Sequence, residues 1–311
     1  MRDRDGLRRF LFERYPIRGH LVRVDAAWRA LIEHRDYPVP VRDALGEAVA
    51  ATLLLAGTIK FDGVLSLQLQ GDGPMPLLLA QCTSGFGVRG LARFEEALGG
   101  DAIGGDARRA DPGTAPRLDA LVGAGHLTVT LESEDQSRRY QGVVPIGGAR
   151  LADSLQGYFE NSEQLPTRLW LFADENGASG MLLQKLPGSP GVEPGEADDL
   201  EDAWRRAQLL GDTLTHAEMR SLADREILRR LFHEDDLRLF DAAPVYFRCR
   251  CSRGRVGNML HALGEEETRA VLAERGEVEV RCDFCNRAYR FDAVDVAEIF
   301  RGTSAGGVSV H

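Results

Sequence analysis

The sequence is poor in cysteine and lysine, and it has neither a long apolar run nor an excess of basic charge. Five of its 311 residues are cysteine, too few and too clustered for a disulfide scaffold, which favours a reducing compartment. The longest apolar run, Ala48 to Ile59, is far too short to span a bilayer. The first residues, Met1 to Asp5, mix both charges and lead into no apolar signal core. These absences predict a cytoplasmic protein that is not secreted and has no membrane partner.

The charge balance argues against a nucleic-acid partner. The chain carries 38 basic and 48 acidic side chains, a formal net charge of −10, whereas contacts with phosphate need a basic surface. Lysine occurs only at Lys60 and Lys185, and we attach no function to this bias. A hydrophobic content of 43% and a charged content of 28% are typical of a globular protein, and the length predicts two or three folded units.

Motifs for catalysis and nucleotide binding are also missing. The seven histidines are scattered, and none pairs with a nucleophile. Glycine-rich stretches such as residues 85–87 are too generic to indicate a phosphate-binding loop. The sequence therefore predicts a protein that is not an enzyme. An enzyme with a structural zinc module remains an alternative.

Alternation of apolar and polar residues predicts an α+β fold. Leu65, Leu67 and Leu69 alternate with polar residues, which is the pattern of a half-buried strand. Residues 43–60 are apolar at helical spacing and predict a helix. The predicted strands are 65–70, 77–82, 88–94, 127–132, 140–145 and 168–172. Residues 99–116, rich in glycine and alanine, predict a mobile loop. We expect a mixed α/β N-terminal domain whose β-sheets are flanked by helices.

A change of composition near residue 190 predicts a domain boundary. Residues 187–191 break the chain, and the sequence from there to Asp241 is charged and helical, with a capping box that begins at Thr215. Such helices are stable only when they pack against another part of the protein. Two interpretations of this stretch stay open: a connecting bundle with a solvated face, and a conformational switch. The predicted organisation is an N-terminal domain (1–190), a helical linker (191–244), a C-terminal zinc-binding module (245–303) and a tail (304–311).

Four of the five cysteines form two close pairs near the C-terminus. Cys249 and Cys251 flank one residue, 30 residues follow, and Cys282 and Cys285 then flank two. Two such pairs are typical of a tetrahedral zinc site. Between them, residues 256–263 and 265–274 predict short helices, and valines and aromatic residues around the second pair predict a β-hairpin. The sequence thus predicts one Zn²⁺ bound by four thiolates, whereas Cys82 is predicted to be a buried small side chain.

A zinc ion with four thiolate ligands leaves no position open for a catalytic water. The arginines near the cysteines and the metal itself both favour thiolate, the form that peroxide or hypochlorous acid attacks. Zn–S bonds of about 2.3 Å put neighbouring sulfurs roughly 3.8 Å apart, so each close pair is nearly positioned to oxidise once the metal leaves. Three interpretations stay open: a redox-responsive site, a redox-inert structural zinc site, and a zinc ribbon whose arginines contact nucleic acid.

Several longer stretches carry a recognisable pattern. Residues 247–253 and 282–285 surround the cysteines, and residues 140–144, 158–168 and 180–184 lie in the first domain. Together they resemble the heat-shock protein 33 family, the redox-regulated molecular chaperones of bacteria. The resemblance covers nearly the whole chain and departs from the family at none of the four cysteines.

The resemblance implies a holdase that works without ATP under oxidative stress. The reduced, zinc-bound form would be a poor chaperone. Oxidation would form the disulfides Cys249–Cys251 and Cys282–Cys285 and release zinc. The module and then the linker would unfold and expose apolar surface that binds unfolded or misfolded client proteins. Family members also dimerise when activated, so a homodimer is expected for the oxidised form.

Overall fold

The computed structural model describes residues 5–95, 98, 117–135, 137–187 and 194–301. The chain divides into two compact units, Met1–Arg248 and Cys249–His311. The loop predicted at 99–116 and the tail predicted at 304–311 lie outside the described residues, as does most of the predicted boundary near residue 190. The three-part division expected from the sequence stays a prediction, and the linker helices fall within the first unit.

The first unit contains two six-stranded sheets, and its predicted strands are confirmed to within about two residues. The first sheet has the order β10-β1-β2-β9-β8, with β11 paired to β1. The second has the order β12-β5-β4-β3-β6-β7. The strands of the first sheet are β1 (Asp5–Phe12), β2 (Ile17–Val24), β8 (Thr167–Ala173), β9 (Ala178–Lys185), β10 (Leu237–Leu239) and β11 (Ala243–Pro244). Those of the second are β3 (Gly63–Gly71), β4 (Leu77–Thr83), β5 (Gly87–Arg93), β6 (Gly125–Ser133), β7 (Arg139–Pro145) and β12 (Tyr246–Phe247).

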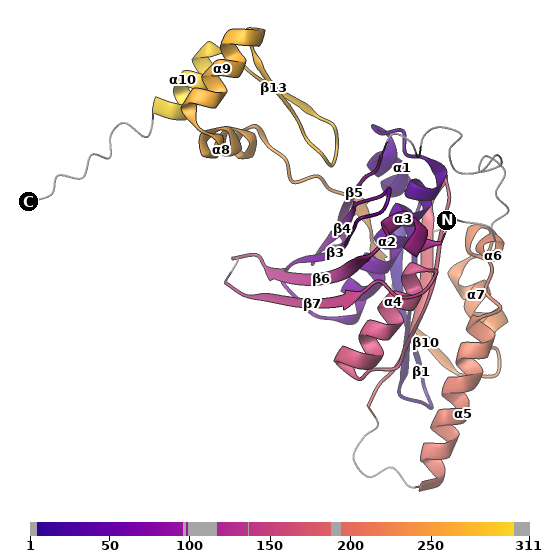
Figure 1. Cartoon of the computed structure of the whole chain (residues 1–311). Helices are drawn as coiled ribbons and strands as arrows, with labels where there is room; N and C mark the ends of the chain where they lie inside the picture. The colour runs from indigo at the N-terminus through magenta and orange to yellow at the C-terminus, as the bar shows by residue number, and fades with distance from the viewer. Residues whose placement is uncertain (1–4, 96–97, 99–116, 136, 188–193, 302–311) are drawn as a thin grey trace, which may run out of the picture. The chain divides into compact units, whose positions relative to one another are not determined.

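Helix α2 (Val39–Thr58) packs against strands of both sheets (Figure 1). It confirms the helix predicted at 43–60, although it begins four residues earlier. Its apolar residues surround the helix, as expected for a helix that is buried on every side. The other helical segments before the linker are α1 (Ala26–Ile32), α3 (Leu118–Val122), α4 (Leu151–Tyr158) and the π-helix η3 (Phe159–Glu163).

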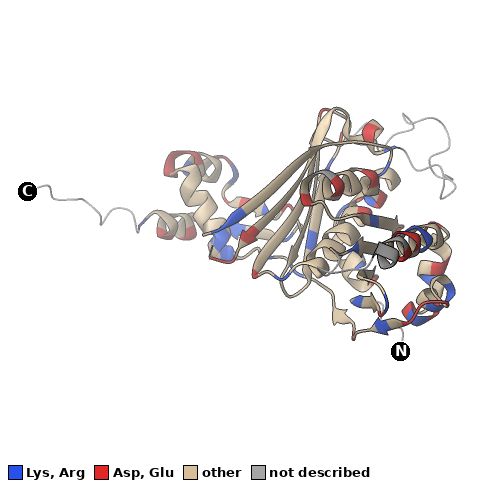
Figure 2. Ribbon diagram, turned by 90° about the horizontal axis from the view of Figure 1, so that it is seen from below, with Lys and Arg blue, Asp and Glu red and all other residues tan. Residues whose placement is uncertain are grey.

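Three helices follow the N-terminal sheets in the predicted linker: α5 (Pro194–Gly211), α6 (His216–Ser221) and α7 (Asp224–Leu231). The capping box predicted at Thr215 is present, since its hydroxyl accepts from the Glu218 N–H and Glu218 accepts from the Thr215 N–H. Residues of both charges are interspersed along these helices (Figure 2). The expectation of helix up to Asp241 was wrong. Helix α7 ends at Leu231, because Leu237 and Leu239 instead pair with β1 as β10.

The second unit has a small core of its own. It consists of α8 (Arg253–Leu263), α9 (Glu265–Arg275), the hairpin β13 (Val278–Arg281) and β14 (Ala288–Phe291), and α10 (Ala293–Arg301). The two short helices and the hairpin predicted from the sequence are confirmed. Seven side chains form the buried core: Val256, Leu260, Val278, Tyr289, Phe291, Val296 and Phe300. A core of this size gives marginal stability, so we expect the unit to depend on a further source of stability.

Candidate functional site: a four-cysteine centre and a covered sheet face

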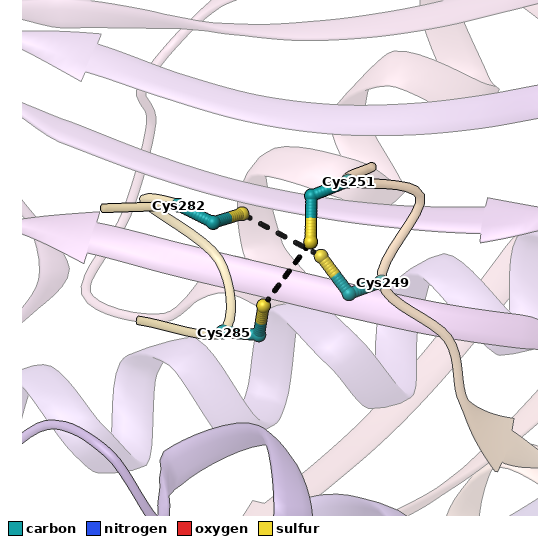
Figure 3. A group of neighbouring side chains, drawn as sticks. All are labelled: Cys249, Cys251, Cys282 and Cys285. Atoms are coloured by element: carbon teal, nitrogen blue, oxygen red, sulfur yellow. Dashed lines mark hydrogen bonds between the residues drawn. The ribbon is translucent and has the colours of Figure 1, made fainter. Parts of the chain in front are cut away.

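The four cysteines of the second unit meet at one point. Cys249 and Cys251 lie just before α8, and Cys282 and Cys285 lie in the turn between β13 and β14. Their sulfurs point toward a common centre and lie within 4.8 Å of one another (Figure 3). The Cys249–Cys282 sulfur distance is 3.6 Å, and the Cys251–Cys285 distance is 3.4 Å. The structure therefore brings together all four residues predicted as ligands.

Local backbone geometry holds each pair in place. In the hairpin turn, the N–H of Asn286 donates to the carbonyl of Cys282 at 2.8 Å, and the N–H of Cys282 donates to the carbonyl of Arg287 at 3.0 Å. Asn286 closes this turn with a φ of 53°, a left-handed conformation that asparagine tolerates better than most residues. At the other pair, Ser252 caps α8 through its hydroxyl, which fixes the chain directly after Cys251.

The donor set fits a tetrahedral metal ion. Four thiolates around zinc place adjacent sulfurs about 3.8 Å apart, close to the two distances above. The cluster could therefore hold a metal, and four sulfur donors are the set that structural zinc prefers. Such a site offers no open position for a catalytic water. That the metal is zinc, and that the disulfides join Cys249 to Cys251 and Cys282 to Cys285, remain predictions.

Three of the sulfurs, those of Cys249, Cys251 and Cys285, have different electrostatic surroundings. Burial raises the pKa of the Cys249 and Cys285 thiols. At Cys251 burial acts in the same direction, but hydrogen bonds from the Tyr289 hydroxyl and from neighbouring sulfurs outweigh it and lower the pKa of Cys251 to about 7. The Tyr289 hydroxyl lies 3.0 Å from the Cys251 sulfur. Sequence reasoning missed this contact, because it joins residues 38 positions apart across the module.

Most arginines near the cysteines have partners other than sulfur. Arg281 and Arg290 both pair with Glu279, and Arg253 pairs with Asp295. Arg253 also lies over the Phe291 ring, 4.4 Å from its centroid. At Arg287, a hydrogen bond with Tyr289 and the charges of Cys251 and Cys285 raise the pKa. Three of these guanidinium groups are therefore engaged with carboxylates of the module itself.

Cys82 lies apart from this centre, in β4 of the first unit. Its side chain is fully buried, as predicted, and burial raises the pKa of Cys82 to about 12. Because the thiolate is the reactive form, we expect Cys82 in the native protein to react with iodoacetamide at least 100-fold more slowly than an exposed thiol. Alkylation followed by peptide mass spectrometry measures this rate. Rapid labelling of Cys82 before the first unit unfolds would contradict the assignment.

A second feature of the first unit is an apolar sheet face that α5–α7 cover (Figure 1). The strands of the first sheet alternate, so one set of side chains faces α2 and the other faces the linker helices. The set facing the linker comprises Phe10, Phe12, Ile17, Leu21, Met181 and Leu183. The linker covers it with Ala203, Trp204, Ala207, Leu214, Met219, Ile227, Leu228, Leu231 and Phe232. If these helices left, they would expose a contiguous apolar surface.

Charged side chains fasten the same helices at the N-terminus of α7. The carboxylate of Asp224 lies 2.8 Å from Nε of Arg8 on β1 and 3.0 Å from Nε of Arg23 on β2. All three side chains are only 12–14% exposed. Nearby, Arg220 of α6 pairs with Asp25 at 3.1 Å. Ion pairs at this depth require good geometry, because desolvation opposes them. The linker is therefore docked by both apolar and charged contacts.

The fold and these two features define a class of protein: an α+β body with a helix-covered sheet, followed by a small four-thiol module. The model of the Hsp33 protein family matches residues 5–292. The 33 kDa chaperonin of Nitrosococcus oceani is 47% identical over 300 residues, 96% of each chain. The 33 kDa chaperonin of Methylobacillus flagellatus is 42% identical over 301 residues, again 96% of each. The chain belongs to the Hsp33 family.

A solved structure agrees with this fold. The crystal structure of the 33 kDa chaperonin from Thermotoga maritima matches with a TM-score of 0.76 at 21% identity, covering 96% of this chain and 99% of that one. Hsp33 chaperonins are not enzymes, and membership of this family implies client proteins as partners. Among the described residues, no helix is long and apolar enough to cross a membrane.

Proposed function

We propose that this protein is a redox-regulated, ATP-independent holdase that binds unfolding proteins during oxidative stress. In the reduced form the four cysteines hold one Zn²⁺ and the protein is inactive. Oxidation forms the disulfides Cys249–Cys251 and Cys282–Cys285 and releases the metal. The module and then the linker unfold, and the activated form dimerises. A reducing compartment such as the cytoplasm keeps the thiols reduced until stress occurs.

The observation that carries this proposal is the apolar face of the first sheet beneath α5–α7. A holdase needs an apolar surface that is hidden in the resting state, since a large exposed patch would promote association. Six large side chains of β1, β2 and β9 supply such a surface here, and two of them are phenylalanines. The four-cysteine centre supplies the trigger, because its ligands are the groups that oxidants attack.

The segment between α7 and Cys249 connects the helices that cover the apolar face to the four-cysteine module. It is held to the two sheets by β10, β11 and β12, which are three, two and two residues long. Such short strands contribute few backbone hydrogen bonds and add little stability of their own. An unfolded module would leave this segment tethered to a disordered chain. We propose that these pairings then break and α7 loses its connection to β1.

The test follows metal, structure and activity in one sample. Reduced protein is treated with hydrogen peroxide at mildly raised temperature, or with hypochlorous acid, while a chromogenic chelator records zinc release. Circular dichroism records helix content, and light scattering records the aggregation of a thermally unfolded client. We expect zinc release, loss of helix and suppression of aggregation to appear together, and sedimentation to show a dimer. Equal suppression before and after oxidation would refute the redox switch.

A further inference from the structure

Tyr289 makes a contact that its place in the hairpin does not require. It lies on β14 opposite Val280, and its ring packs in the module core, where the residue is 8% exposed. Phe291 on the same face of the strand and Val280 opposite are both apolar, so phenylalanine would fill this position equally well. The hydroxyl nevertheless reaches the sulfur of Cys251, 3.0 Å away. A hydroxyl that donates to a ligand sulfur from a ring held in the core indicates a role in the chemistry of the centre.

The hydrogen bonds to the sulfurs differ in kind. The backbone N–H of Cys251 donates to the Cys249 sulfur, and the backbone N–H of Arg287 donates to the Cys285 sulfur. Backbone donors of this kind are fixed by the chain path. Within the described part of the chain, Cys251 is the ligand that receives a side-chain hydroxyl from outside the cluster. The Tyr289 contact is therefore a bond that a single conservative substitution can remove.

Arg287 fixes the direction of this bond. Its guanidinium donates to the Tyr289 oxygen, as the hydrogen bond between the two side chains records. Guanidinium is a donor only, so the tyrosine oxygen accepts from Arg287 and its own proton remains for the sulfur. Arg287 and Tyr289 thus form a short chain of donors that ends on Cys251.

We propose that Tyr289 is a positioning residue that slows the oxidation of Cys251 and so raises the amount of oxidant needed to open the metal centre. The inference rests on the proposed function and concerns the regulation of the same site. In the metal-bound form Cys251 is a thiolate whether or not Tyr289 donates to it, so the bond does not act through the fraction of thiolate. The hydroxyl instead occupies a lone pair of the sulfur, and this bond must break or weaken before an oxidant can react with Cys251. The protein therefore resists low levels of peroxide and responds to higher ones.

The chemical step with hydrogen peroxide is a two-electron oxidation. The Cys251 thiolate attacks one peroxide oxygen, the O–O bond breaks, and hydroxide leaves, which gives a sulfenic acid. A second thiolate then attacks the sulfenic sulfur, an S–S bond forms, the S–O bond breaks, and a second hydroxide leaves. Overall, two thiolates and one peroxide give one disulfide and two hydroxides. The hydrogen bond from Tyr289 acts on the first of these steps.

The test compares the wild type with Tyr289→Phe, which keeps the ring and removes the hydroxyl. Zinc release is measured against peroxide concentration to obtain a second-order rate constant. Trapping of free thiols at timed points, followed by mass spectrometry, follows oxidation of Cys251. We expect both rates to rise about tenfold in the variant, which is the rate equivalent of one hydrogen bond to a charged acceptor. Tyr246→Phe is the matched control, because it removes an exposed tyrosine hydroxyl three residues before Cys249.

Spontaneous metal loss gives a second readout. Zinc transfer to a chelator without oxidant should be nearly equal in the wild type and the variant. If Tyr289→Phe accelerated this transfer as strongly as the peroxide reaction, Tyr289 would govern metal affinity, and the inference would be overturned. Equal peroxide rates in both proteins would overturn it too, and would leave the proposed function intact. Absence of zinc from the reduced wild type would instead refute the proposed function.

Discussion

In reduced protein stripped of its metal, the backbone amides of residues 249–301 are expected to exchange with solvent as in an unfolded chain. Structural zinc contributes on the order of 10–16 kcal/mol to small zinc-binding units. A core as small as that of the second unit supplies only about 3–5 kcal/mol. We therefore expect its seven buried side chains to be too few to keep the unit folded without the metal. Hydrogen exchange read by mass spectrometry, before and after treatment with a strong chelator, measures the change.

The variant Cys282→Ser tests the same expectation without a chelator. It should bind zinc at least 100-fold more weakly, because one of four thiolates is replaced by a poor ligand, and the second unit should lose protection in the reduced state. Cys82→Ala is the matched control, since this cysteine lies in β4 and contributes no sulfur to the centre. It should keep one zinc per chain. A metal-free module with protected amides would contradict the assignment of zinc as its main source of stability.

The sequence predicted the four-cysteine cluster better than it predicted the body of the protein. The spacing of two close pairs involves only two local turns, so the sequence grouped Cys249, Cys251, Cys282 and Cys285, and the structure brings their sulfurs together. The contact from Tyr289 was not found, because it depends on how the hairpin packs beside the chain before α8. Spacing along a chain reveals local ligand pairs, but it does not reveal which distant side chain lies against them.

The first two strands were missed for a similar reason. In β1 and β2 the buried Phe10, Phe12 and Leu21 lie among arginines, which hides the alternation expected of strands. These arginines have partners far along the chain: Arg8 meets Asp224, and Arg18 donates to Gln184. The sequence predicted helix α2, but it did not predict that this helix packs against both sheets. Ala51 and Leu54 are buried together with the predicted apolar stripe, so the helix has no polar face over most of its length.

Asp224→Asn is expected to release the linker in reduced protein without loss of zinc. The carboxylate of Asp224 lies between the guanidinium groups of Arg8 and Arg23 and pairs with both. An asparagine amide has the same size but no negative charge, so both ion pairs would be lost. Breaking a buried ion pair costs about 3 kcal/mol or more, which corresponds to a population of undocked linker roughly 100-fold higher. The same apolar face of β1, β2 and β9 would then be exposed while the four cysteines remain intact.

Three measurements on reduced Asp224→Asn decide the matter. Zinc content should stay at one per chain, hydrogen exchange should accelerate in α5–α7, and client aggregation should be suppressed without oxidant. The matched control is Asp202→Asn, which removes an exposed charge from α5 and should behave as the wild type does. If Asp224→Asn loses linker protection and still fails to hold clients, the surface beneath the linker is not the client-binding site. If linker protection is unchanged, the ion pairs of Asp224 do not fasten the linker, and its docking is set by apolar contacts alone.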